Sequence, residues 1–194
     1  VVLDEQGARD AGEHAGHDSG GSDQRDQRRH DRGDGRRGHT GSGQHAVIAR
    51  WVEGSPVPVF RGDDRQGIYM ATKYLVDLGH RKIAFIGGKR ETSTGRDRRE
   101  GYLAAMREAG IEPDLAWQVG SSATRKAGYD SVRALFESGV RPTGIVCFND
   151  LVAIGVMSGL RSIGLEPGRD IAVTGYDDIS EAEIAAPALT TVWN

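Results

Sequence analysis

Polar side chains follow two apolar, strand-like runs of this chain at the point where each run ends. Asn149 and Asp150 come directly after one run, and Asp177 and Asp178 come directly after another. In an open parallel sheet, ligands bind outside the carboxyl ends of the strands, so these amide and carboxylate groups would face a ligand. Carboxylates accept hydrogen bonds from hydroxyl groups, and an amide can both donate and accept. The sequence therefore predicts a binding site for a small, hydroxyl-rich molecule.

The same polar residues also suit structural roles. Either Asn149 or Asp150 could cap the helix that follows, and Asp177 could cap a shorter one, because Asn and Asp side chains accept hydrogen bonds from the first free N–H groups of a helix. Phe148 and Trp193 lie in or beside strand ends, where an aromatic ring can stack on a sugar face. A place in the core or at an edge is the alternative for both rings.

The elements that would position these residues alternate along the chain from residue 57 onward. Helical spacing of apolar residues and a glycine just past the helix end predict four helices, and short apolar runs predict five strands. The predicted strands are 57–60, 82–86, 117–119, 144–148 and 171–176, and the predicted helices are 66–78, 94–109, 124–138 and 150–163. Strands that are apolar throughout and alternate with helices predict an α/β fold with a doubly wound parallel sheet.

Composition limits the class of protein. The chain has 194 residues and a formal net charge of −3, so its overall charge gives no reason to expect a DNA-binding surface. Cys147 is the single cysteine and lies in an apolar run, which favours a reducing cytoplasm and excludes a disulfide framework. The sequence contains no apolar stretch long enough for a membrane span and no signal peptide. Nucleotide and catalytic motifs are also missing, so we predict neither an enzyme nor a bound cofactor or metal.

The first 45 residues differ in composition from the rest. Between Glu5 and His45 the chain has no Val, Ile, Leu, Met, Phe, Trp, Tyr or Cys. Such a segment has too little apolar surface to offset the entropy of ordering its backbone, about 1–2 kcal/mol per residue. We therefore predict that residues 1–45 are a disordered tail or an out-of-frame translation.

Five motifs occur in an order and spacing that resemble the effector-binding domain of the LacI/GalR family of bacterial transcription regulators. The motifs are KYLVDLGHRKIAFIGG (73–88), RREGYL (98–103), FND (148–150), GYDD (175–178) and PALTTV (187–192). The resemblance implies a fold like that of type I periplasmic binding proteins, in which two α/β subdomains enclose the ligand. It also implies that residues 46–81 are a remnant of the N-terminal subdomain and that residues 82–194 form most of the C-terminal effector-binding subdomain.

The resemblance assigns roles to individual residues. Arg98 matches an arginine that reaches the effector hydroxyl groups, Asn149 matches an amide at a strand end, and Asp177 or Asp178 matches the acid that accepts hydrogen bonds from the effector. Without the resemblance, Arg98 would be an ordinary surface residue of its helix.

The resemblance also implies partners. The effector would be a small molecule, a sugar, and helix 150–163 would form a homodimer. Operator DNA would be bound only by the intact parent protein, because no DNA-binding headpiece is recognisable in this chain. A solute-binding protein of a sugar transporter is the alternative function.

Overall fold

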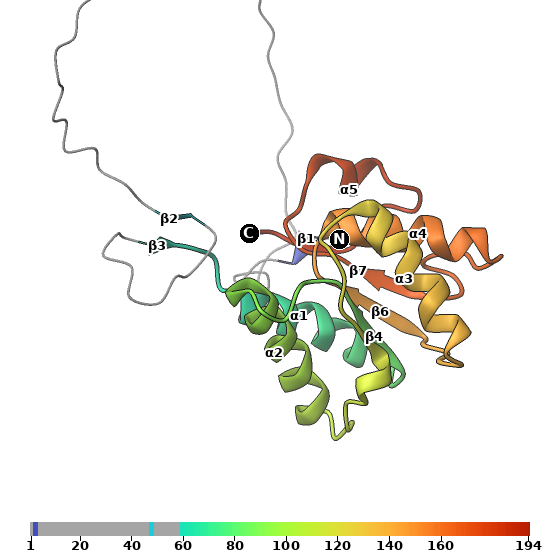
Figure 1. Cartoon of the computed structure of the whole chain (residues 1–194), viewed down its shortest axis with the longest axis horizontal. Helices are drawn as coiled ribbons and strands as arrows, with labels where there is room; N and C mark the ends of the chain where they lie inside the picture. Colours follow the sequence, from blue (N-terminus) through green and yellow to red (C-terminus); the bar gives the residue numbers. More distant parts are fainter. Residues whose placement is uncertain (1, 4–46, 49–58) are drawn as a thin grey trace, which may run out of the picture.

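The computed structural model describes residues 2–3, 47–48 and 59–194, and Figure 1 shows their arrangement. The strands are β1 (Val2–Leu3), β2 (Val47–Ile48), β3 (Val59–Phe60), β4 (Ile83–Ile86), β5 (Gln118–Val119), β6 (Gly144–Cys147), β7 (Ala172–Thr174) and β8 (Thr191–Val192). The helices are α1 (Asp64–Asp77), α2 (Ser93–Glu108), the 3₁₀ turn Leu115–Trp117, α3 (Arg125–Glu137), α4 (Asp150–Ser162) and α5 (Ser180–Ile184). The four predicted long helices are confirmed to within two residues at each end.

The central sheet has four parallel strands in the order β5-β4-β6-β7. Helices cover both of its faces, with α1 and α2 on one side and α3 and α4 on the other, as Figure 1 shows. The predicted α/β fold with a doubly wound parallel sheet is confirmed. Two further parallel pairs, β1 with β8 and β2 with β3, lie outside this sheet.

The alternation of side chains along each strand divides the core into two layers. In β4, Ile83 and Phe85 pack with α1 and α2, whereas Ala84 and Ile86 pack with α3 and α4. Successive residues of a strand point to opposite faces of the sheet, so a strand covered by helices on both faces must be apolar at every position. The four residues of β4 are accordingly all buried.

Local sequence signals fix where the helices begin and end. Thr92 caps α2 and Asn149 caps α4, since their side-chain oxygens accept hydrogen bonds from backbone N–H groups in the first turn. At the end of α2, Gly110 adopts a φ of 69°, and the N–H of Ile111 reaches back to the carbonyl of Met106. This is a Schellman ending, in which a left-handed residue closes the helix and the next apolar residue packs against it.

Part of the predicted N-terminal tail lies outside the described residues. Val2–Leu3 are described and pair with β8, and of the rest of residues 1–45 the structure describes nothing. Within the described residues, no helix combines the length and the apolar character needed to cross a lipid bilayer.

Candidate functional site

The connections of the sheet reverse direction between β4 and β6. From β4 the chain passes through α2 to β5 on one side, and from β5 it returns through α3, past β4, to β6. Neighbouring strands whose connections leave in opposite directions open a crevice at their carboxyl ends, and ligands of open α/β sheets bind there. In this chain the glycines after β4 and Phe148 and Asn149 after β6 lie at that point, which makes it the candidate site.

Arg98 of α2 is the centre of a buried cluster at this switch point. Its Nε donates to Asp64 Oδ1 (2.7 Å), its Nη1 donates to the carbonyl oxygen of Phe148 (2.6 Å), and its Nη2 donates to Asp177 Oδ1 (3.2 Å). The Arg98 side chain is only 7% exposed, and that of Asp64 is equally buried. A buried guanidinium needs both charge compensation and hydrogen bonds, and here α1, the residue after β6 and the loop after β7 supply them. We call Asp64, Arg98, Phe148, Tyr176 and Asp177 the Arg98 cluster.

Two aromatic rings hold the guanidinium group of Arg98 in place. Its central carbon lies 4.5 Å from the ring centroid of Phe148 and 3.9 Å from that of Tyr176. A guanidinium over an aromatic face at such distances gains about 0.5–2 kcal/mol, more where water is excluded. Burial raises the pKa of Tyr176 to about 12, so its ring stays neutral beside the cation. The rings and hydrogen bonds together fix one orientation of Arg98.

The loop after β7 has an unusual backbone conformation. Asp177 has a φ of 110° and Asp178 a φ of 51°, although neither is a glycine. Positive φ in a residue with a Cβ costs of order 1–3 kcal/mol and is found mainly where surrounding contacts enforce it, often at functional sites. Here the Asp177 N–H donates to the carbonyl of Val192, and the Asp178 N–H approaches Thr191 Oγ1 (3.4 Å). The last strand of the chain therefore maintains the strained turn.

Part of the hydrogen-bonding capacity of the cluster is not used by the described residues. A guanidinium has five N–H donors, and Arg98 donates three of them, one from each nitrogen, to described residues. From the same part of the chain Asp177 accepts at Oδ1 only, and one third of its side chain is exposed. Burial raises the pKa of Asp177, and the neighbouring guanidinium of Arg98 offsets part of that rise. A donor and an acceptor that no described residue uses therefore lie side by side in this pair.

Asp150 has a different position from the other predicted site residues. Its side chain is fully buried, its Oδ1 accepts from Thr191 Oγ1 (2.6 Å) and its Oδ2 accepts from the N–H of Ile179 (2.9 Å). Burial raises the pKa of Asp150 to about 6, although both hydrogen bonds act in the opposite direction. Gly175 lies against this carboxylate, and a Cβ there would come within 2.0 Å of Oδ1. Asp150 joins the start of α4 to β8 and to the loop after β7.

The other predicted site residues lie around the cluster. Asn149 rather than Asp150 is the N-cap of α4, and its Oδ1 accepts from the N–H of Val152 (3.0 Å). Asp177 does not cap the short helix after it, because α5 begins after Ile179 without a side-chain cap. Trp193 pairs with Asp177 through a parallel β-bridge, and its side chain is 65% exposed. The structure therefore brings Arg98, Phe148 and Asp177 into contact and places Trp193 beside them.

Asp64 and Thr191 contribute to the site but were not predicted from the sequence. Asp64 follows the N-cap of α1, and its position suggests only a favourable charge in the first turn of a helix. Thr191 lies in an apolar terminal run and carries no signal of its contact with Asp150. Asp64 lies 34 residues from Arg98 in the sequence, and Thr191 lies 41 residues from Asp150. The pair of aspartates at the start of α1 was the available clue, since Asp63 alone supplies the cap.

The fold and the site define a ligand-binding α/β domain, and comparison with known proteins identifies its family. Residues 72–193 match the periplasmic binding protein-like domain, and the chain belongs to that family. More particularly, it is an effector domain of the LacI type, as the resemblance in the sequence indicated. The type I periplasmic-binding-protein-like fold predicted from that resemblance is likewise confirmed.

Curated and solved relatives agree on this assignment. The HTH-type transcriptional repressor PurR of Haemophilus influenzae (strain PittEE) is 34% identical over 146 residues, which cover 75% of this chain and 44% of the repressor. A LacI family regulator from Enterococcus faecium with bound ribose superposes with a TM-score of 0.71 at 28% identity, covering 77% of this chain and 55% of the regulator. The transcriptional regulator CelR in its cellobiose complex gives a TM-score of 0.71 at 30% identity, covering 77% and 46%. The chain spans less than half the length of the PurR repressor it matches.

Proposed function

We propose that this chain is the effector-sensing part of a sugar-responsive transcription regulator and that the effector binds at the Arg98 cluster. The observation that carries the proposal is the Arg98–Asp177 pair, buried on one side and open on the other, at the switch point of the sheet. Its guanidinium is already oriented by Asp64 and two rings, so little side-chain entropy remains to be lost when a ligand binds. Such preorganisation favours a ligand-binding role over a purely structural ion pair.

The chemistry of the open side suits vicinal hydroxyl groups. One hydroxyl can donate to Asp177 Oδ2 while its neighbour accepts from a free N–H of Arg98, and charge-assisted hydrogen bonds of this kind are stronger than neutral ones. The exposed ring of Trp193 lies beside Asp177 and can stack on the sugar face. Two of the solved relatives have a sugar, ribose or cellobiose, as bound ligand, which supports the same class for this chain.

The predicted site residues take different roles in this proposal. Arg98 and Asp177 contact the effector directly, and Asn149 offers its amide N–H₂ group, which bonds to no other described residue. The ring of Phe148 packs against the guanidinium group of Arg98. Asp150 and Asp178 fix the loop that carries Asp177 and are positioning residues.

The regulator would act through its effector in the intact parent protein. Effector binding across two subdomains changes their relative orientation and so shifts the population of DNA-binding states. Operator DNA would be the partner of such a regulator in the cytoplasm. The relatives reported above are transcription regulators, which supports this function over the solute-binding protein of a sugar transporter.

Isothermal titration of the intact chain with ribose, cellobiose and related sugars tests the site. We expect Asp177→Asn to weaken sugar binding at least about tenfold, because losing a charged hydrogen-bond acceptor costs roughly 1.5–3 kcal/mol. Asp130→Asn, in an exposed ion pair of α3, is the matched control and should bind as the wild type does. Equal affinity of the Asp177→Asn variant and the wild type for every sugar that binds would refute the assignment.

We also propose a homodimer through α4, the helix predicted for this role. Leu151 and Ile154 on α4 are only half buried, and Ile184 of α5 is 81% exposed. Apolar residues gathered on one surface favour association over solvation. Light scattering on the purified chain should show a dimer that Ile154→Glu converts to monomer. Leu115→Glu, at an exposed leucine far from α4 in sequence, should leave the dimer intact; a monomeric wild type would end this proposal.

A further inference from the structure

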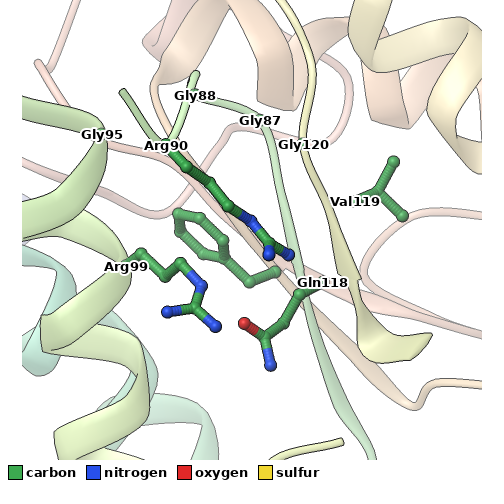
Figure 2. A pocket seen from close by; sticks show the side chains of 9 residues that line it. Gly87, Gly88, Arg90, Gly95, Arg99, Gln118, Val119 and Gly120 are labelled. Carbon is green, nitrogen blue, oxygen red and sulfur yellow. The ribbon is translucent and has the colours of Figure 1, made fainter. Parts of the chain in front are cut away.

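A second, narrower crevice lies between α2 and the carboxyl ends of β4 and β5, as Figure 2 shows. Arg98 turns toward α1 and Phe148, whereas the next residue, Arg99, turns toward this crevice. The lining residues are Phe85, Gly87, Gly88, Arg90, Gly95, Arg99, Gln118, Val119 and Gly120. In Figure 2 the side chains of Arg90 and Arg99 point toward Gln118 from two sides. The crevice thus gathers two cations and one amide, and the effector site uses none of them.

Gln118 presents an unsatisfied acceptor to the crevice. The residue is 7% exposed, and its Nε2 donates to the backbone carbonyl of Asp114 (3.0 Å). That hydrogen bond fixes the orientation of the amide, because exchanging Nε2 and Oε1 would place Oε1 against the carbonyl oxygen of Asp114. The buried Oε1 then finds no hydrogen-bond partner among the described residues. Leaving such an acceptor unpaired costs about 1–3 kcal/mol, so the site favours a ligand that brings a donor.

The two arginines supply donors that the described part of the protein hardly uses. Arg99 Nε is buried without a hydrogen-bond partner there, and its guanidinium meets only Glu100, at 3.9 Å. Arg90 is exposed and forms no hydrogen bond or ion pair with another described residue. Because its long side chain forms the outer wall of the crevice, it can swing to admit an anion. Two guanidinium groups with so little internal compensation attract a ligand of negative charge.

The remaining walls are backbone, and with Arg90 as it lies the crevice has room for little more than one water molecule, so a larger ligand enters only when that side chain swings out. Gly87 and Gly88 follow β4 with φ values of 107° and 75°, and Gly120 follows β5 across from them. A Cβ on Gly88 would come within 2.5 Å of the Phe148 ring, so this position must remain a glycine. A ligand in the crevice therefore meets backbone on one side and charged side chains on the other.

We propose that this crevice binds a phosphate group, either as inorganic phosphate or as the phosphate of a small phosphomonoester. The deprotonated oxygens accept from Arg90 and Arg99, and a P–OH hydrogen is donated to Gln118 Oε1. Inorganic phosphate carries both kinds of oxygen around neutral pH, since its dianion keeps one P–OH hydrogen, and a phosphomonoester does so below its second pKa, near 6. Sulfate has the same shape but no proton to donate, so Gln118 makes the site selective for phosphate over sulfate. This site is separate from the Arg98 cluster, and the proposal does not depend on the sugar-binding one.

Titration of the intact chain with sodium phosphate and with sodium sulfate tests the proposal directly. Inorganic phosphate should bind more tightly than sulfate both at pH 6 and at pH 8, because its dianion keeps one P–OH hydrogen, whereas a phosphomonoester should lose its preference over sulfate as the pH rises from 6 to 8. Arg90→Ala, which removes an exposed side chain, should weaken phosphate binding at least about fivefold. Arg107→Ala, at an exposed arginine of α2, should change nothing.

A second variant isolates the role of Gln118. Gln118→Leu should still bind both anions but lose the preference for phosphate, and circular dichroism should confirm that it folds. Equal affinity of the wild type for phosphate and sulfate would overturn the role of Gln118. Phosphate affinity that Arg90→Ala leaves unchanged would overturn the site itself. Sugar binding is measured with other ligands and at Asp177, so either proposal can fail while the other stands.

Discussion

Asp150→Asn should change how the stability of the protein depends on pH. Asp150 is fully buried at the start of α4, and burial raises its pKa from 3.8 to about 6. Asn has nearly the same shape but does not titrate in this range. The substitution also costs one acceptor to Thr191 or Ile179, and this loss is the same at every pH. The pH-dependent part of the difference therefore belongs to the buried carboxyl group.

The sign and size of the effect follow from proton linkage. Between pH 4 and pH 6 the native protein keeps the Asp150 proton while the unfolded chain has lost it, so the free energy of unfolding falls as the pH rises. Below pH 4 both states are protonated, and above pH 6 both are ionised. A rise in pKa from 3.8 to about 6 corresponds to about 3 kcal/mol, since one pKa unit equals about 1.4 kcal/mol. The wild type should lose about this much relative to Asp150→Asn between pH 4 and pH 7.

Urea unfolding of both proteins at half-unit steps from pH 4 to pH 7 measures this difference. Asp177 also has a pKa raised by burial, and its charge contributes to the pKa of Asp150. A parallel series with Asp177→Asn in both backgrounds separates the two carboxyl groups. A stability difference between wild type and Asp150→Asn that stays constant with pH, or that grows in favour of the wild type, would refute the reasoning.

Two further substitutions test the packing around the site. Asp64→Ala leaves Arg98 without its buried acidic partner and should lower the free energy of unfolding by about 3 kcal/mol or more. Asp97→Ala is the control, because Asp97 lies in a partly exposed ion pair, and it should lower the free energy of unfolding by less than about 1 kcal/mol. Similar losses in urea unfolding would contradict the buried position of Asp64. Gly175→Ala should lower the thermal midpoint by several degrees, because its Cβ would overlap a buried carboxylate oxygen, while Gly120→Ala, where the nearest atom is 3.8 Å away, should be tolerated. An unchanged midpoint for Gly175→Ala would contradict this contact.

Much of the fold could be predicted because its signals are local. The four glycines past the helix ends, such as Gly110, stop their helices within one turn, and each signal acts through neighbouring residues. Strand β4 is apolar at every position, which is possible only where both faces are covered. Strand ends were predicted less well: the run 171–176 forms a strand only at Ala172–Thr174, because the chain beyond it turns into the strained loop of Asp177.

The site was predicted less completely because its contacts are distant in sequence. Arg98, Asn149 and Asp177 came from motifs, but no local pattern shows that Asp64 compensates the charge of Arg98. Asp150 follows its strand just as Asp178 does, yet the first is fully buried and the second is partly exposed. Spacing alone cannot distinguish them, since burial at a strand end depends on where β8 and the loop after β7 return.

The positive φ angles of Asp177 and Asp178 place two selective pressures in opposition. Glycine at either position would relieve backbone strain and so favour folding, but it would remove a carboxylate. Selection for stability alone should therefore enrich glycine in a randomised library of these positions. Selection for effector binding should retain aspartate at 177, because relief of backbone strain does not replace the charge that the proposed function requires. Under the proposed function, a single substitution in the loop after β7 would therefore increase folding stability at the expense of effector binding.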